Sequence, residues 1–198
     1  MNLTPYYLRM IKNYDYDTYL HCVRVAVLTN EIGNIEGLNS VELKQLSISA
    51  LLHDVGKIRV PKSILIKPGK LNAMEWVEMI NHPAYGVEIL KNAEQPFAEE
   101  IIESIHCHHE FYNGEGYPRG IKKDEIPLYA RIITIADSID AMIVKRPYHQ
   151  KALSLENAIK EVIENTGTQF DPNVAEKISN INLNITKSLG ITNSAFFV

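Results

Sequence analysis

Apolar residues recur every three to four positions along most of the chain, a spacing that buries one stripe of an α-helix. Leu20, Val23 and Val27 carry such a stripe in a helix predicted over residues 16–32. A second predicted helix begins with Ser40 as its N-cap and runs into His53 and Asp54. Further stripes predict helices over residues 83–91, 97–109, 128–144 and 154–164, and a last helix that begins at residue 172.

The stretches between these helices contain the residues that interrupt helical structure. Glycine and proline recur over residues 56–69, which predicts a loop after the second helix. Asn72 followed three residues later by Glu75 is typical of a capping box, so a third helix is predicted to open there and to end near residue 82. Glycines and prolines between residues 110 and 127 predict a long ordered loop.

The pattern as a whole predicts an all-α fold in one domain of about seven or more helices, since no strand pattern or internal repeat is present. The domain is predicted to cover residues 1–182, because residues 183–198 show no clear period. That tail is either a surface segment or an oligomer contact, so a homodimer is one of the alternatives for the oligomeric state. A chain of 198 residues is long enough for one well-buried core.

Composition narrows the classes of function. A net charge of −4 argues against binding of polymeric nucleic acid, which requires clustered Lys and Arg. The sequence contains neither an apolar run of about 20 residues nor a signal peptide, so we expect a cytoplasmic protein that does not enter the membrane. Cys22 and Cys107 are too few for a disulfide framework and are predicted to be reduced core thiols.

The candidate chemistry lies in histidines and carboxylates that suit borderline divalent metals. Five histidines and two aspartates exceed what one tetrahedral ion needs: His21, His53, Asp54, His82, His108, His109 and Asp137. An Asp that follows a His directly can offer one oxygen to each of two ions, so Asp54 is the predicted bridge. Two such ions can clamp a phosphoryl group during in-line attack. The absence of a thiolate ligand favours iron or manganese, with zinc as the alternative.

Each of these residues also has an ordinary structural explanation. A single helical histidine such as His21 is usually a hydrogen-bonded core residue, and His82 before Pro83 is compatible with a helix cap. The pair His108 and His109 is harder to explain in this way, because adjacent imidazoles in an apolar region need partners. Asp137 lies within the apolar run RIITIADSID, where an unpaired carboxylate is unfavourable and a metal ion would stabilise it.

Six blocks follow one another in order across the chain: HDVGK at 53–57, His82 with Pro83, HHEFYNGEGYP at 108–118, IADSIDA at 135–141, RPY at 146–148 and FDP at 170–172. In this order they resemble the signature of HD-GYP domains within the HD metal-dependent phosphohydrolase superfamily. The resemblance implies an HD-type helical bundle with a long GYP loop. It also implies a metal-dependent phosphodiesterase that hydrolyses cyclic di-GMP to pGpG, and in some members further to GMP.

The same resemblance assigns roles to individual residues. It places the five histidines, Asp54 and Asp137 at the metal positions of the family. Asp17 stands where some members carry a Glu that holds a third ion; the alternative is a solvated carboxylate in the first helical turn, where the helix dipole favours it. Asp54 and Lys57 are the implied catalytic residues, with Lys57 meeting the scissile phosphate. The alternative for Lys57 is a surface lysine at a helix end.

The implied substrate contacts lie in the GYP loop and after the helix predicted to end at residue 144. Glycines in the loop permit close approach of a ligand, the tyrosine can stack on guanine, and an arginine can contact guanine or phosphate. A plain turn and an exposed arginine are the corresponding alternatives. The implied contacts are Gly114, Gly116, Tyr117, Pro118 and Arg146.

Two positions depart from the family pattern. Asn113 stands where members often carry Asp, and His149 stands where a Lys or Arg often follows RPY. These changes leave the metal positions complete but put the choice between cyclic di-GMP and a hybrid cyclic dinucleotide in doubt.

Other functions stay open beside hydrolysis of cyclic di-GMP. The rival is a catalytically weak signalling adaptor that binds a cyclic dinucleotide or a protein partner. Hydrolysis of a nucleoside phosphate is a third alternative. The intact set of metal positions favours the enzyme. Three arrangements stay open for it: a free-standing enzyme, one regulated by a partner protein, and a piece of a longer chain with a fused sensor module.

Overall fold

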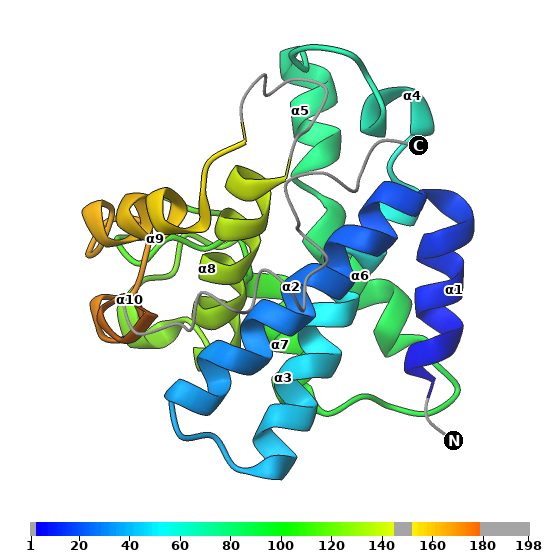
Figure 1. Cartoon of the computed structure of the whole chain (residues 1–198). Helices are drawn as coiled ribbons and strands as arrows, with labels where there is room; N and C mark the ends of the chain where they lie inside the picture. Colours follow the sequence, from blue (N-terminus) through cyan, green and yellow to red (C-terminus); the bar gives the residue numbers. More distant parts are fainter. Residues whose placement is uncertain (1–2, 145–151, 179–198) are drawn as a thin grey trace.

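The computed structural model of the chain describes residues 3–144 and 152–178. Arg146, His149 and the predicted tail over 183–198 lie outside the described residues. Within them the fold is all-α, as predicted, and β pairing is limited to an isolated bridge between Thr166 and Phe170. The helices are α1 (Thr4–Tyr14), α2 (Tyr16–Ile35), α3 (Ser40–Leu52), η1 (Val55–Arg59), α4 (Lys62–Leu65), α5 (Ala73–Met79), α6 (His82–Lys91), α7 (Glu99–Cys107), η2 (Lys123–Glu125), α8 (Leu128–Ile143), α9 (Leu155–Glu164) and α10 (Pro172–Ile178) (Figure 1).

The capping interactions confirm most of the predicted helix starts. Asn72 and Glu75 form the predicted capping box at the start of α5, and the Ser154 side chain caps α9. The predicted N-cap of α3 is wrong by one residue. Asn39 is the cap: its Oδ1 accepts the Glu42 backbone N–H at 3.1 Å, while the Glu42 carboxylate accepts the Asn39 N–H at 2.8 Å.

Four helical segments in the described part of the chain lie where the apolar pattern predicts none. Helix α1 precedes the first predicted helix, η1 and α4 lie in the loop predicted over residues 56–69, and η2 lies in the loop predicted between residues 110 and 127. The η1 and α4 segments have five and four residues, so an apolar stripe cannot recur in them. Helix α1 buries Tyr7 and Ile11 one turn apart and leaves most of its other residues outside the core.

Two hydrophobic clusters share the central helices α2 and α3. One cluster packs α2 and α3 against α8, α9 and α10, and the other packs them against α1, η1, α6 and α7. In Figure 1, α8, α9 and α10 lie on one side of α2 and α3, and α1 lies on the other side. Cys22 and Val25 of α2 belong to different clusters, as do Leu52 and Ala50 of α3. His21 and His53 therefore lie where the two clusters meet.

Both cysteines are buried and free, which agrees with their prediction as core thiols. Burial raises the pKa of the Cys107 thiol to about 12. Among the described helices, none is both long enough and apolar enough to cross a lipid bilayer.

Helix α6 approaches η1 so closely that the contact requires glycine. A Cβ added to Gly56 would lie 1.9 Å from the carbonyl oxygen of His82 and 2.5 Å from the backbone nitrogen of Gly86. Both neighbours are backbone atoms, so neither can move aside without displacing α6. Gly56 thus fixes the distance between the segment that follows Asp54 and the helix that begins with His82.

We predict that Gly56→Ala lowers the free energy of unfolding by about 3 kcal/mol or more, because the new methyl group overlaps fixed backbone. Gly86→Ala is the matched control. Its added Cβ would meet the Ile105 side chain at 3.2 Å, and alanine favours the helix, so the change is expected to stay within about 1 kcal/mol. Urea unfolding of the metal-free variants measures both values. Equal destabilisation by the two substitutions would contradict the close-approach argument.

Candidate metal centre

Six of the predicted ligand residues form two compact groups. His21, His53 and Asp54 make the first group, and His82, His108 and His109 make the second. In each group the three ligand atoms lie within 4.8 Å of one another. His21 comes from α2, while the other residues lie at or just beyond the ends of α3, α6 and α7. Residues separated widely in sequence are therefore brought to one place, as predicted.

Asp54 belongs to the first group and also reaches the second group. Its Oδ2 is 3.5 Å from Nε2 of His21 and 3.4 Å from Nε2 of His53, whereas its Oδ1 is 3.3 Å from Nε2 of His82. Oδ1 is buried and has no hydrogen-bond partner in the described part of the chain. A buried carboxylate oxygen without a partner is unfavourable, and a cation beside it would stabilise it. One oxygen faces each group, which is the arrangement expected of a bridging ligand.

Hydrogen bonds to helix ends fix the tautomer of three histidines. Nδ1 of His53 donates to the Ala50 carbonyl at 2.7 Å, Nδ1 of His82 to Met79 at 2.8 Å, and Nδ1 of His108 to Ile105 at 2.7 Å. These carbonyls lie in the last turns of α3, α5 and α7, where helix carbonyls lack intrahelical partners. A carbonyl can only accept, so each Nδ1 carries the hydrogen and each Nε2 is left to bind a metal.

The Nε2 atoms face one another across the centre. Nε2 of His82 lies 3.2 Å from Nε2 of His108. Burial lowers the pKa of both imidazoles well below the ordinary value, so both are neutral. Two lone pairs at this distance repel, since neither nitrogen has a hydrogen to donate. A divalent cation between them would replace the repulsion with two bonds, so this donor set fits a metal ion.

Two aspartates favour the protonated form of the His21 imidazole. Burial lowers its pKa, but hydrogen bonds to Asp137 and Asp140 outweigh burial and raise the pKa to about 9. Its Nε2 lies 3.1 Å from Oδ1 of Asp137 and 3.2 Å from Nε2 of His53. Asp137 thus lies at the edge of the first group, and its role as a metal ligand stays a prediction. A cation that binds there would take the place of the Nε2 proton.

Asp140 is a residue of the site that the sequence analysis did not single out. Its Oδ2 accepts a hydrogen bond from Nδ1 of His21 at 2.7 Å, and its two oxygens accept from Arg24 at 2.6 and 3.0 Å. Asp140 thereby orients the imidazole that faces Asp54. The spacing of Asp137 and Asp140 along a predicted helix was the available signal, because residues three apart share a helix face.

Lys57 lies beside the carboxylate between the two groups. Lys57 lies in η1, three residues after Asp54, and its Nζ donates a hydrogen bond to Oδ2 of Asp54 at 2.6 Å. Burial raises the pKa of Asp54, but the charge of Lys57 and the neighbouring histidines hold it well below its usual range. Asp54 is therefore ionised, and a positive side chain already stands at the centre.

The GYP loop folds back onto the second group. The Tyr117 ring stacks on the His109 ring, with centroids 4.8 Å apart, and the Tyr117 N–H donates to the His109 carbonyl at 3.1 Å. Gly116 has no room for a side chain, since an added Cβ would lie 2.2 Å from the Phe111 nitrogen and 2.4 Å from the His109 oxygen. Gly114 has a φ of +88°, and the peptide bond between Tyr117 and Pro118 is cis.

Two other sequence positions lie apart from the groups. Asp17 is exposed in the first turn of α2 and is not among the six grouped residues, so its role as a ligand of a third ion stays a prediction. Asn113 closes a local turn: its amide donates to the Glu115 carboxylate at 2.8 Å and its oxygen accepts the Glu115 N–H at 3.0 Å. An Asp at this position could not donate to Glu115.

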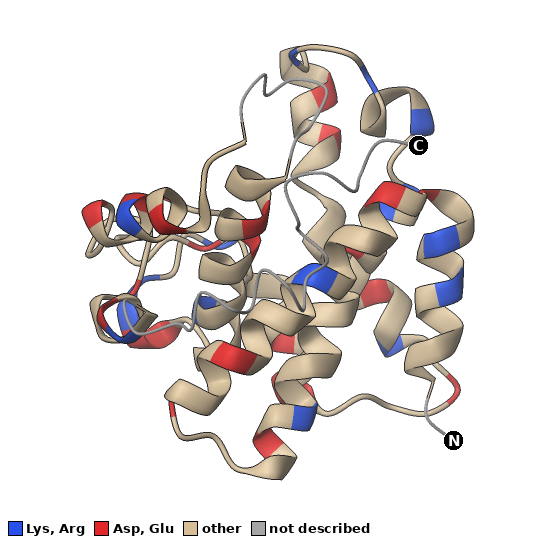
Figure 2. Ribbon diagram, viewed as in Figure 1, with Lys and Arg blue, Asp and Glu red and all other residues tan. Residues whose placement is uncertain are grey.

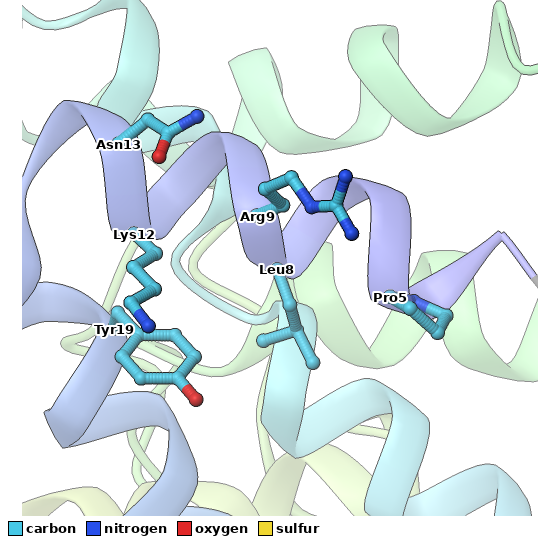
Figure 3. Close-up of a pocket in the computed structure, with 6 residues that line it drawn as sticks. All are labelled: Pro5, Leu8, Arg9, Lys12, Asn13 and Tyr19. Atoms are coloured by element: carbon cyan, nitrogen blue, oxygen red, sulfur yellow. The ribbon is translucent and has the colours of Figure 1, made fainter.

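Two hollows beside α1 are lined by none of the grouped residues. The hollow in Figure 3 is formed by one face of α1 and by Tyr19, beside which the Lys12 amine lies. Figure 2 shows acidic and basic segments interspersed over the helices.

We predict that Asp140→Asn weakens metal binding about 10- to 100-fold, because the charge that orients the His21 imidazole is lost. Competition with a metallochromic chelator measures the affinity. Asp171→Asn is the matched control, since Asp171 is also buried and paired with an arginine, at 2.5 Å from Arg131, but contacts none of the grouped residues. If both variants lost the same affinity, general destabilisation would explain the effect and the orienting role would be wrong.

The chain is similar to curated phosphodiesterases over most of its length. A cyclic di-GMP phosphodiesterase of Thermotoga maritima is 37% identical over 180 residues, which cover 90% of this chain and 49% of that protein. The cyclic di-GMP phosphodiesterase response regulator RpfG of Xanthomonas campestris is 35% identical over 86% of this chain and 45% of that protein. The 3'3'-cGAMP-specific phosphodiesterase 3 of Vibrio cholerae is 41% identical over 77% of this chain and 32% of that protein. The chain spans less than half the length of these relatives.

Solved structures share the fold at lower sequence identity. The HD domain of the L. monocytogenes phosphodiesterase PgpH superposes with a TM-score of 0.66 and 21% identity, covering 93% of this chain and 98% of that chain. An HDG"Y"P protein of Bdellovibrio bacteriovorus gives a TM-score of 0.66 and 20% identity, covering 81% of this chain and 51% of that chain.

The match to a family model includes the entire candidate centre. The model of the HD domain matches residues 8–174, which contain both groups of ligand residues, Asp137 and Lys57. Together with the all-helical fold, this match establishes that the chain belongs to the HD domain family.

Proposed function

We propose that this chain is a metal-dependent phosphodiesterase of the HD-GYP subgroup that hydrolyses cyclic di-GMP to pGpG, with GMP as a further product. The observation that carries the proposal is the position of Asp54, whose two oxygens face two separate groups of histidines while Lys57 lies against it. Two cation sites that share one carboxylate suit a phosphodiester, because the attacking and leaving oxygens both carry charge in an in-line displacement.

The residues that would hold the ions are the two groups of three, with Asp137 at the edge of the first group. Divalent ions held there supply Lewis acidity and a water of lowered pKa. The all-nitrogen and oxygen donor set favours iron or manganese, with zinc as the alternative. A third ion at Asp17 belongs to the proposal as an option, since Asp17 lies one helical turn before His21.

The protein's own groups contribute charge and position. Lys57 would stabilise negative charge on the scissile phosphate, and its ion pair with Asp54 keeps the ammonium close to the centre. Tyr117 would border the substrate from the second group, with Gly114, Gly116 and Pro118 shaping the loop around it. Arg146 would contact guanine or phosphate as sequence resemblance implies; it lies outside the described residues.

The relatives support a cyclic dinucleotide as the substrate. They leave two candidates, cyclic di-GMP and 3'3'-cGAMP, which differ in their bases. Those described above include phosphodiesterases named for cyclic di-GMP and for 3'3'-cGAMP, at 35–41% identity. Cyclic di-GMP is proposed as the substrate, and the hybrid dinucleotide is the first competitor. Regulation by a sensor module or partner outside this chain is part of the same proposal, in keeping with relatives in which the matched region covers less than half of the length.

The proposal is tested with protein prepared anaerobically and loaded with iron or manganese under reducing conditions. Chromatography of the reaction with cyclic di-GMP should show pGpG first and GMP later. Parallel reactions contain 3'3'-cGAMP, a nucleoside phosphate and an activated phosphodiester. Metal-loaded protein that binds cyclic di-GMP in calorimetry without forming product would replace the enzyme with the adaptor function.

Two substitutions separate metal binding from catalysis. Asp54→Ala is expected to abolish both retained metal and turnover, because both groups lose their shared carboxylate. Lys57→Ala is expected to retain metal and to lower kcat about 100- to 1,000-fold, as removal of one charge-stabilising donor does. Metal analysis and steady-state kinetics measure both effects. A Lys57→Ala variant with unchanged kcat would exclude the proposed role of Lys57.

A further inference from the structure

Trp76 is a large aromatic side chain that the fold leaves uncovered. It is the single tryptophan of the chain and is 51% exposed on α5, a helix that buries none of its residues. Met74 and Val77 on the same helix are exposed as well. Packing of the described core therefore does not explain the indole. In Figure 1, α5 lies at one end of the molecule, beside α4.

Trp76 continues a series of aromatic rings that begins at the metal centre. The Tyr117 ring stacks on His109 at 4.8 Å with an interplanar angle of 29°, so one face of Tyr117 is covered. The Trp76 ring lies 6.4 Å from the Tyr117 ring at an interplanar angle of 75°. Because the two rings meet almost at right angles, they do not cover each other as stacked rings would. A flat group can therefore lie against the exposed indole.

The start of α5, the helix that carries this indole, is held by several contacts. Glu75, the residue before Trp76, closes the capping box with Asn72 and accepts hydrogen bonds from Lys67 at 2.6 and 2.8 Å. These contacts tie the start of α5 to the segment that follows α4. A stacking surface held in advance by its own helix loses less conformational freedom when a ligand binds.

We infer that one base of the cyclic dinucleotide stacks on Trp76, which makes Trp76 a substrate-binding residue; this inference rests on the proposed function. With a phosphodiester at Asp54 and Lys57, the base of the adjoining nucleotide extends outward past His109 and Tyr117 to the indole. Every base presents an aromatic face, so stacking on Trp76 adds affinity for the nucleotide irrespective of which purine it carries. Selection between guanine and adenine is left to other contacts.

The test compares Trp76→Ala and Trp76→Phe with Val77→Ala, an equally exposed position on the same helix. Trp76→Ala is expected to raise the KM for cyclic di-GMP about tenfold with little change in kcat, since loss of one base stack weakens binding by that order. Trp76→Phe should restore most of the affinity, because it keeps an aromatic face. Val77→Ala should leave KM unchanged.

The single tryptophan also provides a direct signal. Rapid mixing of the metal-loaded protein with cyclic di-GMP should quench the indole fluorescence before turnover. The cyclic di-GMP concentration that gives half of the maximal quench should equal the dissociation constant of the binding step. Three results would overturn the inference: absence of a quench, an unchanged KM in Trp76→Ala, or an equal rise of KM in Val77→Ala. The exposed face of α5 would then fit a protein contact better.

Failure of this inference differs from failure of the proposed function. In the first case wild-type protein hydrolyses cyclic di-GMP, but the Trp76 variants behave like the wild type. In the second case wild-type protein neither hydrolyses nor binds cyclic di-GMP, and both statements fall together. If the protein hydrolysed only the activated phosphodiester, it would still be a phosphodiesterase. Cyclic di-GMP as its substrate and Trp76 as a stacking residue for that substrate would both be rejected.

Discussion

The buried carboxylate of Asp54 is the constraint to which the rest of the centre is adapted. A charge taken out of water is stabilised only by opposite charge and hydrogen bonds. Lys57 supplies one positive group to Oδ2, but Oδ1 faces His82, which is neutral. The lone pair of a neutral imidazole cannot satisfy Oδ1, which has no hydrogen-bond partner in the described part of the chain. A divalent cation between Oδ1 and the histidines of the second group would supply the missing positive charge, whereas Lys57 and the His21 imidazole already lie beside Oδ2.

Helix ends explain how the imidazoles meet this requirement. His53, His82 and His108 each donate from Nδ1 to a carbonyl in the last turn of a helix. One hydrogen bond thus satisfies a terminal carbonyl and also directs Nε2 toward the centre. His21 is oriented differently, by Asp140 and through it by Arg24. The ligands on helix ends are set by local structure, whereas the His21 imidazole depends on a contact between two distant helices.

Close backbone approaches bring the two groups together. Gly56 allows η1 to lie against the start of α6, which positions His82 opposite Asp54. Gly116 does the same for the GYP loop, which places Tyr117 on His109. In the proposed function these contacts have a further consequence, because the loop leads from the ions to Trp76 on α5. The centre would then hold the phosphodiester while the aromatic rings hold a base.

The sequence by itself determined the helical class, most helix positions, and which residues to consider as metal ligands, because apolar periodicity, capping boxes and short motifs are local features that a chain displays directly. It did not reveal α1, nor η1, α4 and η2, which are too short to show a period, and it placed the cap of α3 on Ser40 instead of Asn39. Only the tertiary structure decided that Asp140 orients His21 across 119 residues and that Trp76 lies beside Tyr117. Such contacts depend on how helices pack, and packing brings together side chains whose separation in sequence carries no signal.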